Sequence, residues 1–494
     1  MRNEKCLESR RWIWIFLVWM LMGAVALRGQ DEGAETPSAP ELLKDPFLKE
    51  ASGGAPADYG KRDPYAEVAA EAAAVAREPE RVIAVSSEFI EVPREKWIKV
   101  MAADEGDPLD GTTLREEVQK WLESGEAAHV GGGMTVARSG QRASVQSVQE
   151  FLYPTKTEPY GPNARFPAAF ETLLLGHQLE VDPQIYPEKY AKEGDLGDEG
   201  KGGWPKIGLA MVSEMGWYAG EYRYGYEPDA LLGEPLVIEP IFRFFKSTNQ
   251  VIMASGEYRL MDAFSWTNED GAPLTESKVL SFVRADIVEL EPTVGQKSPP
   301  KRAQAVLKFE WIEVDSDWWA GWLLDHEGSS FILTARAAVE ELLDERRASI
   351  MEVLHLPMLS GQRQKSESKR FMVYPTEWIP AEEVGMRSER TASEPRNLGV
   401  TVEVDPALGP GGYADVNLVP EIVTHVGENV HQRIEVDGEW VPDVTMPLFY
   451  EMKTVTSVTL ALSQAMLISV MAPADEVGFP DGERRVLLFL TVRR

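Results

Sequence analysis

The stretch that decides the fold is SGQRASVQSVQEFLYPT at residues 139–155, because it returns later in the chain. Residues 360–376 read SGQRQKSESKRFMVYPT, so that both SGQR and YPT recur 221 positions further on. A repeat of this kind predicts two copies of one structural unit before any chemistry is considered. The function must therefore be one that a doubled unit can serve.

The same correspondence continues on both sides of this stretch. Upstream, FIEV at 89–92 matches WIEV at 311–314, and downstream GHQLEVDP at 176–183 matches GVTVEVDP at 399–406. Near the end of each copy, VLSF at 279–282 matches VLLF at 486–489, 207 positions apart. The first copy thus has sixteen extra residues in the polar, Gly-rich stretch from Gln184 to Lys206. We expect this insertion to form an exposed loop, where extra length costs little.

The N-terminus has the three parts of an export signal. A basic stretch precedes an apolar run from Trp12 to Leu27, which contains the small-residue site Ala24-Val25-Ala26. We predict a signal peptide at 1–26, with an uncleaved membrane anchor as the alternative, and therefore an exported protein of the periplasm or outer membrane. Cys6 lies inside this signal, so the mature chain would contain no cysteine and no disulfide or thiolate metal site.

Composition and periodicity predict the remaining organisation. A stretch rich in Ala, Glu and Pro, residues 27–80, is typical of a flexible tether, and a Pro-containing linker at 291–302 separates a first repeat at 81–290 from a second at 303–494. Alternating apolar residues such as Val400, Val402 and Val404 indicate strands, and Thr113 and Glu116 form a possible capping box at the start of a helix. The predicted fold is α+β and β-rich, with two tandem domains of mixed strands and one helix near the start of each. Val486–Leu490 is apolar on both faces, which favours a central strand.

The charge excludes one class of partner. The chain has 80 Asp and Glu residues against 50 Lys and Arg, a formal net charge of -30. This charge repels phosphate backbones, so we expect no nucleic-acid partner.

No pattern in the sequence predicts an active site. His425 and His431, with Glu428 between them, are the nearest histidine pair, and a metal site there is the less favoured alternative to structural histidines. Ser139-Gly140-Gln141 lacks the strained elbow of a nucleophilic serine, and Gly131-Gly132-Gly133 precedes a strand and not a helix. We therefore predict no catalytic, cofactor or metal residues, and a protein that is not an enzyme.

Each copy contains an ordered series of motifs: an apolar strand ending in a Val-Glu-Val-like motif, a helix, a Gly-Gln turn, a Gly-to-Pro strand, a Pro-x-Phe strand and a terminal apolar strand. This order resembles the secretin domain of bacterial type II and type III secretion systems and type IV pili. In the first copy the series is Phe89–Val92, Ser139–Arg142, Gly176–Pro183, Pro240–Phe242 and Val279–Val283. In the second it is Trp311–Val314, Leu356–Gln362, Gly399–Pro406, Pro447–Phe449 and Val486–Leu490.

The chain departs from the secretin pattern in two respects. Neither copy has the Gly-Gly-Leu-like turn or the lip segment of secretins, and only a tether precedes the two copies. The resemblance therefore implies a divergent, duplicated secretin-like component of a secretion or pilus apparatus. We expect its role to be structural, in a homo-oligomer or together with other components of the apparatus, and we do not expect the chain itself to be a gated pore. The alternative is a soluble periplasmic or surface scaffold that binds a protein partner.

An aromatic series in the first copy bears on membrane contact. Trp217, Tyr218, Tyr222, Tyr224 and Tyr226 lie close together, three of them at alternate positions, as in the girdle of a lipid-facing strand. The alternative is an aromatic cluster packed inside the protein.

Overall fold

The computed structural model describes residues 79–103, 111–160, 164–187, 205–224, 237–268, 272–291, 303–326, 331–382, 386–436 and 438–494. The predicted signal peptide and nearly all of the tether lie outside these residues. So do most of the linker at 291–302 and most of the insertion between Gln184 and Lys206, whose predicted exposure stays a prediction.

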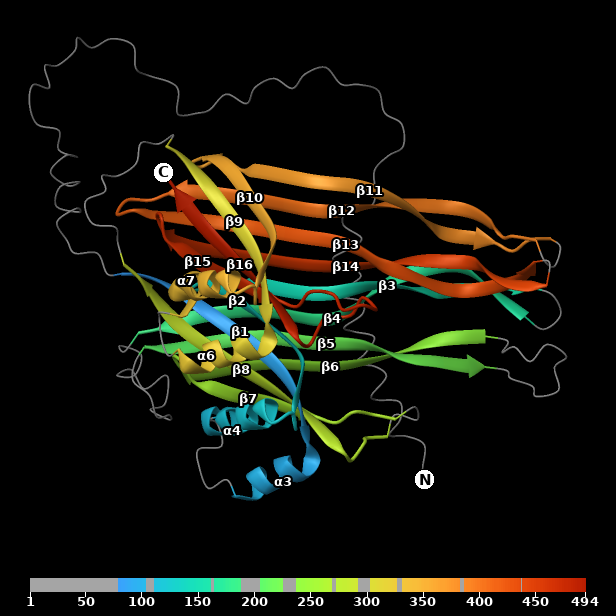
Figure 1. Ribbon diagram of the computed structural model, residues 1–494, viewed down its shortest axis with the longest axis horizontal. Coiled ribbons are helices and arrows are strands. Elements are labelled where there is room, and N and C mark those ends of the chain that lie inside the picture. The colour runs from blue at the N-terminus through green and yellow to red at the C-terminus, as the bar shows by residue number, and fades with distance from the viewer. Residues whose placement is uncertain are drawn as a thin grey trace, which may run out of the picture. The chain divides into compact units, whose positions relative to one another are not determined.

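Strands dominate both halves of the chain (Figure 1). The elements of the first half are β1 (Glu80–Pro93), α3 (Arg94–Ala103), α4 (Thr112–Glu123), β2 (Ala128–Arg138), β3 (Ala143–Tyr160), β4 (Ala164–Tyr186), β5 (Lys206–Tyr224), β6 (Val237–Ala254), β7 (Tyr258–Phe264) and β8 (Ser277–Leu290). Those of the second half are β9 (Gln304–Asp315), α6 (Ser316–Asp325), α7 (Phe331–Asp344), β10 (Ser349–Leu359), β11 (Gln364–Ile379), β12 (Glu389–Leu408), β13 (Tyr413–Val436), β14 (Glu439–Ala461), β15 (Ala465–Met471) and β16 (Arg484–Arg493). The predicted α+β, β-rich class is confirmed.

The strands form two eight-stranded sheets to which both halves contribute equally. Sheet A has the order β10-β9-β16-β15-β2-β1-β8-β7, and sheet B the order β11-β12-β13-β14-β3-β4-β5-β6. In sheet A, the strands β2-β1-β8-β7 of the first half have the same order as their counterparts β10-β9-β16-β15 of the second half. In sheet B, β3-β4-β5-β6 of the first half likewise correspond to β11-β12-β13-β14 of the second half. The repeat seen in the sequence is therefore a repeat of topology.

All ladders between the described strands are antiparallel, whereas the sequence predicted mixed strands. Most successive strands are joined by short turns, and a short turn can connect neighbouring strands only if they are antiparallel. β16, which contains Val486–Leu490, lies between β9 and β15 and is buried along most of its length, so its predicted central position is confirmed.

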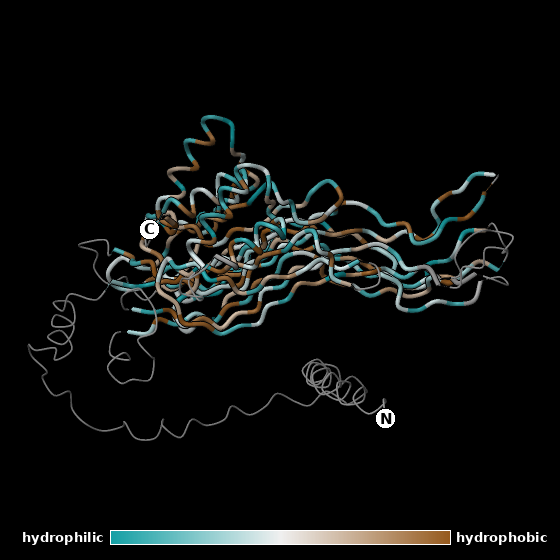
Figure 2. Tube along the Cα trace, turned by 90° about the horizontal axis from the view of Figure 1, so that it is seen from below, coloured by the Kyte–Doolittle hydropathy of each residue, from teal (hydrophilic) through white to brown (hydrophobic). Residues whose placement is uncertain are grey.

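One hydrophobic core runs between the two sheets and through both halves. It includes Val82 and Met134 of sheet A and Val145 and Val416 of sheet B, all at most 1% exposed. Figure 2 shows the hydropathy along these strands, with apolar segments inside the layered part and mixed polarity along the free ends of the longest strands. Because the same core crosses the junction, the two halves are bound together by apolar burial as well as by strand pairing.

The repeated SGQR motif forms the same turn twice. The Gly140 amide donates to the carbonyl oxygen of Pro183 at 2.8 Å, and the Gly361 amide donates to that of Pro406 at 2.7 Å. The serine hydroxyl oxygens accept from the Ile185 and Leu408 amides, both at 2.9 Å. Each turn thus attaches the start of β3 or β11 to the end of the neighbouring strand, β4 or β12.

In the described residues each half has two helices near its start, one more than the sequence predicted. The additional helices are α3 and α6, which directly follow β1 and β9. Asp315 caps α6, because its Oδ1 accepts from the Asp317 amide at 2.9 Å and from the Trp318 amide at 3.2 Å. The helix has three tryptophans and no polar stripe, so it lacks the amphipathic pattern by which helices are found in a sequence.

The capping box predicted at Thr113 is wrong. Helix α4 begins at Thr112, its N-cap is Gly111, and no side chain caps it. The Gly111 amide instead donates to the Tyr258 carbonyl oxygen at 2.8 Å, so the helix start is fixed by a tertiary contact with β7.

Candidate functional site

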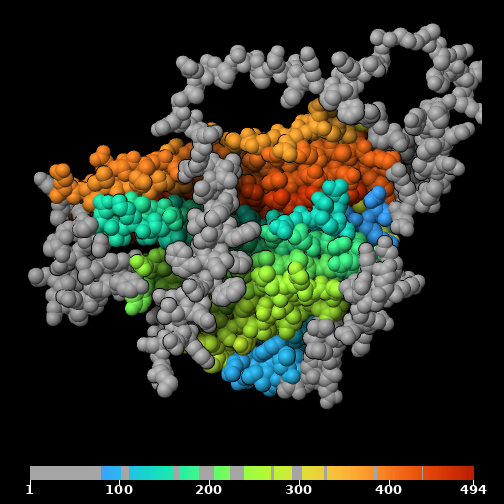
Figure 3. All heavy atoms as spheres, turned by 180° about the vertical axis from the view of Figure 1, so that it is seen from behind, coloured from blue at the N-terminus to red at the C-terminus, as the bar shows by residue number. Residues whose placement is uncertain are grey.

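The two halves meet along one seam that continues through both sheets. In sheet B, residues 449–455 of β14 pair with residues 144–150 of β3, with Phe449 opposite Glu150. In sheet A, Ser469 and Val470 of β15 pair with Thr135 and Met134 of β2. Figure 3 shows the second half, orange to red, in contact with the first half along this line.

Ion pairs and hydrogen bonds between side chains join the two halves across the seam in sheet B. Arg396 of β12 donates to Glu150 of β3, with Nε 3.1 Å from Oε2, and to Oε2 of Glu451 of β14 at 2.8 Å. Gln146 of β3 also donates to Glu451. Burial raises the pKa of Glu150, although its bonds and attraction to Arg396 act in the opposite direction. A carboxylate of each half is thus held by one guanidinium across the seam.

Close packing shapes the seam in sheet A. A Cβ added at Gly133 would lie 3.1 Å from the Val470 carbonyl oxygen and 3.2 Å from the His177 ring. The Thr454 hydroxyl donates to the Ser469 hydroxyl at 2.8 Å, and the Thr456 hydroxyl donates to the carbonyl oxygen of Val136. The glycine run at 131–133 therefore permits close approach between β2 and its neighbours, which explains it without a ligand.

The strands equivalent to the seam strands lie at the outer edges of the sheets. The counterparts of β14 and β15 are β6 and β7, and those of β3 and β2 are β11 and β10. Among the described strands, β6 pairs only with β5, whereas β11 pairs with β12 and forms one further ladder pair, Glu377 with Ala169 of β4. The outer edge of each half is therefore equivalent to the edge with which the other half pairs at the seam.

Apolar side chains are exposed along these outer edges. On β11, Phe371 is 68% and Val373 69% exposed, and on β6, Phe244 is 40% and Ile252 43% exposed. The seam counterpart of Val373 is Leu152, which is 2% exposed. Val373 at the outer edge is thus exposed, whereas its counterpart Leu152 is buried in a hydrophobic cluster.

An ion pair that was not predicted from the sequence occurs in both halves, buried in the first half and partly buried in the second. Arg115 of α4, fully buried, donates from Nε to Glu88 Oε2 of β1 at 2.8 Å. In the second half Arg336 of α7 donates from Nη2 to Glu310 Oε1 of β9 at 3.1 Å. Burial alone would raise the pKa of Glu88, but the charge and hydrogen bonds of Arg115 outweigh it and the pKa is lowered. These pairs anchor the helices to sheet A.

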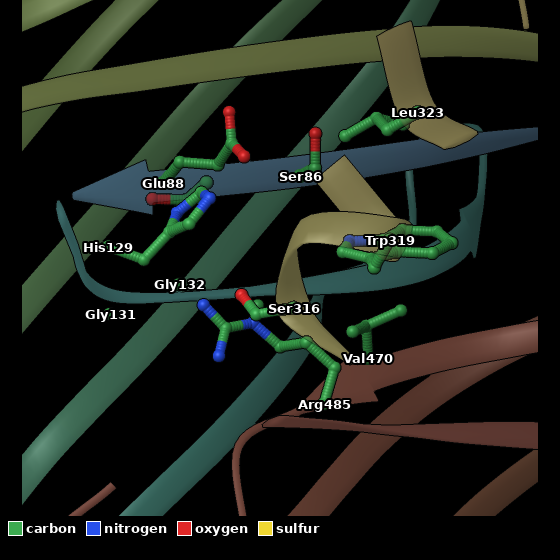
Figure 4. A pocket seen from close by; sticks show the side chains of 12 residues that line it. Ser86, Glu88, His129, Gly131, Gly132, Ser316, Trp319, Leu323, Val470 and Arg485 are labelled. Carbon is green, nitrogen blue, oxygen red and sulfur yellow. The ribbon is translucent and has the colours of Figure 1, made fainter. Parts of the chain in front are cut away.

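A small cavity lies at the seam between β1, β2, α6, β15 and β16 (Figure 4). Its volume is about 10 Å³, which is room for one water-sized species, and its polar lining includes Glu88, His129, Ser316 and Arg485. Burial, with the nearby Arg485 charge, lowers the pKa of His129 to about 3, so the ring is neutral at pH 7.

Among the described side chains around this cavity, no nucleophile is hydrogen-bonded to a base, since neither ring nitrogen of His129 nor the Ser316 hydroxyl has a hydrogen-bond partner. Both Glu88 oxygens accept from Arg115, and the Ser87 hydroxyl shares a 2.8 Å hydrogen bond with Ser213. Arg485 Nη1 is bonded to carbonyl oxygens, including that of Asp481 at 3.0 Å. The cavity is therefore a polar gap in the junction of the two halves.

The structure does not bring the histidines together. The rings of His425 and His431 contact different phenylalanines, Phe449 at 6.1 Å and Phe170 at 4.9 Å between centroids. In the described residues no three His, Cys, Asp or Glu side chains are grouped so that they could hold a metal ion.

Part of the aromatic series in β5 packs within the protein. Trp217 contacts Phe245 and Trp266, both at 4.9 Å between centroids, and Tyr218 stacks on Phe151 at 5.2 Å. Tyr222 is 52% exposed, and the side chains of Tyr224 and Tyr226 lie outside the described residues. In the part of the chain that the structure describes, no helix has both the length and the hydropathy needed to cross a membrane.

Comparisons with known proteins yielded structural similarity only. No family model and no curated protein matches the chain. Among solved structures, it is similar to the type II secretion system secretin GspD of E. coli K12, with 13% identity, a TM-score of 0.19, and coverage of 45% of this chain and 53% of that one. It is also similar to the type IV competence pilus secretin PilQ of V. cholerae, with 8% identity, a TM-score of 0.18, and coverage of 87% and 64%. The chain thus spans less than two thirds of the length of either.

Proposed function

We propose that this protein is an exported, secretin-like structural component of a bacterial secretion or pilus apparatus, in the periplasm or at the outer membrane. In this role it assembles with copies of itself or with other components of the apparatus, and it performs no catalysis. The ordered series of secretin-like motifs, present in both copies, supports this assignment.

The observation that carries the proposal is the seam. One half joins the other by edge-to-edge pairing of β14 with β3 and of β15 with β2, and the equivalent edges, β6 with β7 and β10 with β11, lie at the outer ends of the two sheets. Unpaired strand edges are sites at which further strands add. A unit that already joins to its own duplicate in this way is suited to building a larger assembly.

Fractionation of native cells tests this function. We expect the chain in the envelope fraction, as a large complex on a native gel of the detergent extract, and we expect its deletion to reduce secretion or piliation. A soluble monomer bound to a different protein would support the scaffold alternative. Normal secretion and piliation without the chain would contradict the proposal.

A further inference from the structure

We propose that β6 of one copy pairs with β11 of a second copy, in the register that joins β14 to β3 within a single chain. This inference deepens the proposed function and rests on its claim of self-assembly. Its basis is that β6 is the counterpart of β14, and β11 is the counterpart of β3, in the repeated strand order. The contact between copies is then a second instance of the seam already present within each copy.

The internal seam fixes the register. Within the chain, Phe449 lies opposite Glu150, and Lys453 lies opposite Gln146. The counterparts of these four residues in the other half place Phe242 opposite Phe371, and Lys246 opposite Glu367. The β11 edge is available for this pairing because its ladder with β4 has a single pair, Glu377 with Ala169, which lies beyond the paired segment.

The side chains at these positions are complementary. Phe371 is 68% exposed in the single chain, and pairing with Phe242 would cover it with an aromatic side chain. Lys246 and Glu367 carry opposite charges, and each already takes part in ion pairs within its own sheet, with Glu214 at 2.6 Å and with Lys365 and Lys369, both at 2.8 Å. Aromatic pairs and opposite charges directly across two strands stabilise a sheet.

One pair in this register is unfavourable. Arg243 of β6 comes opposite Arg370 of β11, where the internal seam has Tyr450 opposite Gln149. Like charges directly across two strands weaken pairing, and basic residues on edge strands limit uncontrolled association. The interface is therefore of moderate strength and should respond to a change of charge at either arginine.

The pairing is head to tail, which has a consequence for the size of the assembly. Each copy offers one β6 edge and one different edge, β11, so the contact generates either a closed ring or an open filament. Every copy contributes two repeats, hence a closed ring contains twice as many repeats as chains. Internal seams and seams between copies then alternate around the ring.

Engineered cysteines test the register. The mature chain would have no cysteine of its own, so Cys pairs can be introduced into it without further change. Residues directly opposite in antiparallel strands have Cα atoms about 5 Å apart, which suits a disulfide. We expect oxidised Phe242→Cys/Phe371→Cys to give a ladder of linked multimers on a non-reducing gel. The matched control, Phe242→Cys/Lys369→Cys, is two residues out of register on the same edge and should give little or none.

A charge-swap cycle gives an independent measurement. Arg243→Glu and Arg370→Glu, each alone, should tighten self-association about five- to tenfold in sedimentation velocity. The double variant should return to the weaker association of the unmodified chain. Equal ladders from both cysteine pairs, or equal association constants for all four chains, would overturn the register. If the ladder forms but secretion and piliation do not depend on the chain, the proposed function fails and the register stands.

Discussion

Glu88 and Arg115 form an ion pair, with 2.8 Å between Arg115 Nε and Glu88 Oε2, in a position where the Arg115 side chain is fully buried. The pair joins helix α4 to strand β1. Its counterpart in the second half, Glu310 with Arg336, joins α7 to β9. The duplication therefore preserves a charged contact as well as the strand order, and in each half this contact links a helix to sheet A.

Breaking this buried pair should destabilise the protein strongly. Arg115→Met leaves the Glu88 carboxylate buried without its partner, and we expect a loss of about 3–5 kcal/mol in the free energy of unfolding. Urea unfolding measures it. The matched variant Arg336→Met should cost less, because the Arg336 side chain is 19% exposed and water can reach Glu310 more easily. Equal, small losses would show that neither pair holds its helix.

Acid should destabilise the fold through its buried histidines. Burial, with the Arg485 charge, lowers the pKa of both His129 and His177 to about 3. The unfolded chain binds protons near pH 6.5 while the folded chain does not, so stability is fully present above pH 6.5 and is lost as the pH falls from there toward 3.

The size of this effect follows from the same shift. Each histidine should remove about 2 kcal/mol between pH 7.5 and pH 5. Urea midpoints at the two pH values measure the loss of stability. In His177→Gln, the part of this loss that comes from the two histidines should fall by about half. An unchanged pH dependence in this variant would mean that His177 becomes protonated in the folded protein.

Gly399 should be essential to the pairing of β11 with β12. Its φ is +122°, and an added Cβ would lie 2.1 Å from the Ser368 carbonyl oxygen. Gly399→Ala should therefore cost more than about 3 kcal/mol in the free energy of unfolding. Gly361→Ala is the matched control in the same half, since Gly361 also has a positive φ but no atom within 4 Å of an added Cβ. A similar cost for both would show that the backbone conformation, and not the contact with Ser368, sets the requirement.

The purified chain should not behave as a gated channel. The sequence predicts that both copies lack the gate and lip segments of secretins, so we expect no discrete conductance steps from mature protein in planar bilayers. A variant with Asp at Leu488, in the central strand β16, controls for contaminating channels. Large, reproducible steps that this Leu488→Asp variant abolishes would restore a pore-forming role.

The sequence predicted those features of the fold that depend on local residues. The SGQR turns are predictable because the same four residues recur in each half, and β16 is recognisable because Val486–Leu490 has no polar face. Helix α6 was missed because its tryptophans leave no amphipathic stripe. Strand direction was not predictable from period-2 patterns, which are the same in parallel and antiparallel strands.

The seam between the two halves could not be predicted from the sequence. Pairing of β14 with β3 joins residues some 300 positions apart, and neither strand carries a residue pattern that identifies its partner. The Glu88–Arg115 pair did have a signal, since Glu310 and Arg336 occupy the corresponding positions of the second repeat. An acidic residue repeated in the strand and a basic residue repeated in the second helix after it are therefore a signal for this pair, although Glu91 and Glu313 recur in the same two strands.

The central claim is that a chain with one internal seam builds a larger assembly by repeating that seam between copies. Native mass spectrometry of the chain, extracted from cell envelopes in mild detergent, tests this most directly. We expect a complex of many copies that dissociates into smaller species when Phe371→Asp introduces an unpaired charge into the β11 edge. A single-chain mass at every concentration, or a complex whose mass Phe371→Asp leaves unchanged, would contradict it.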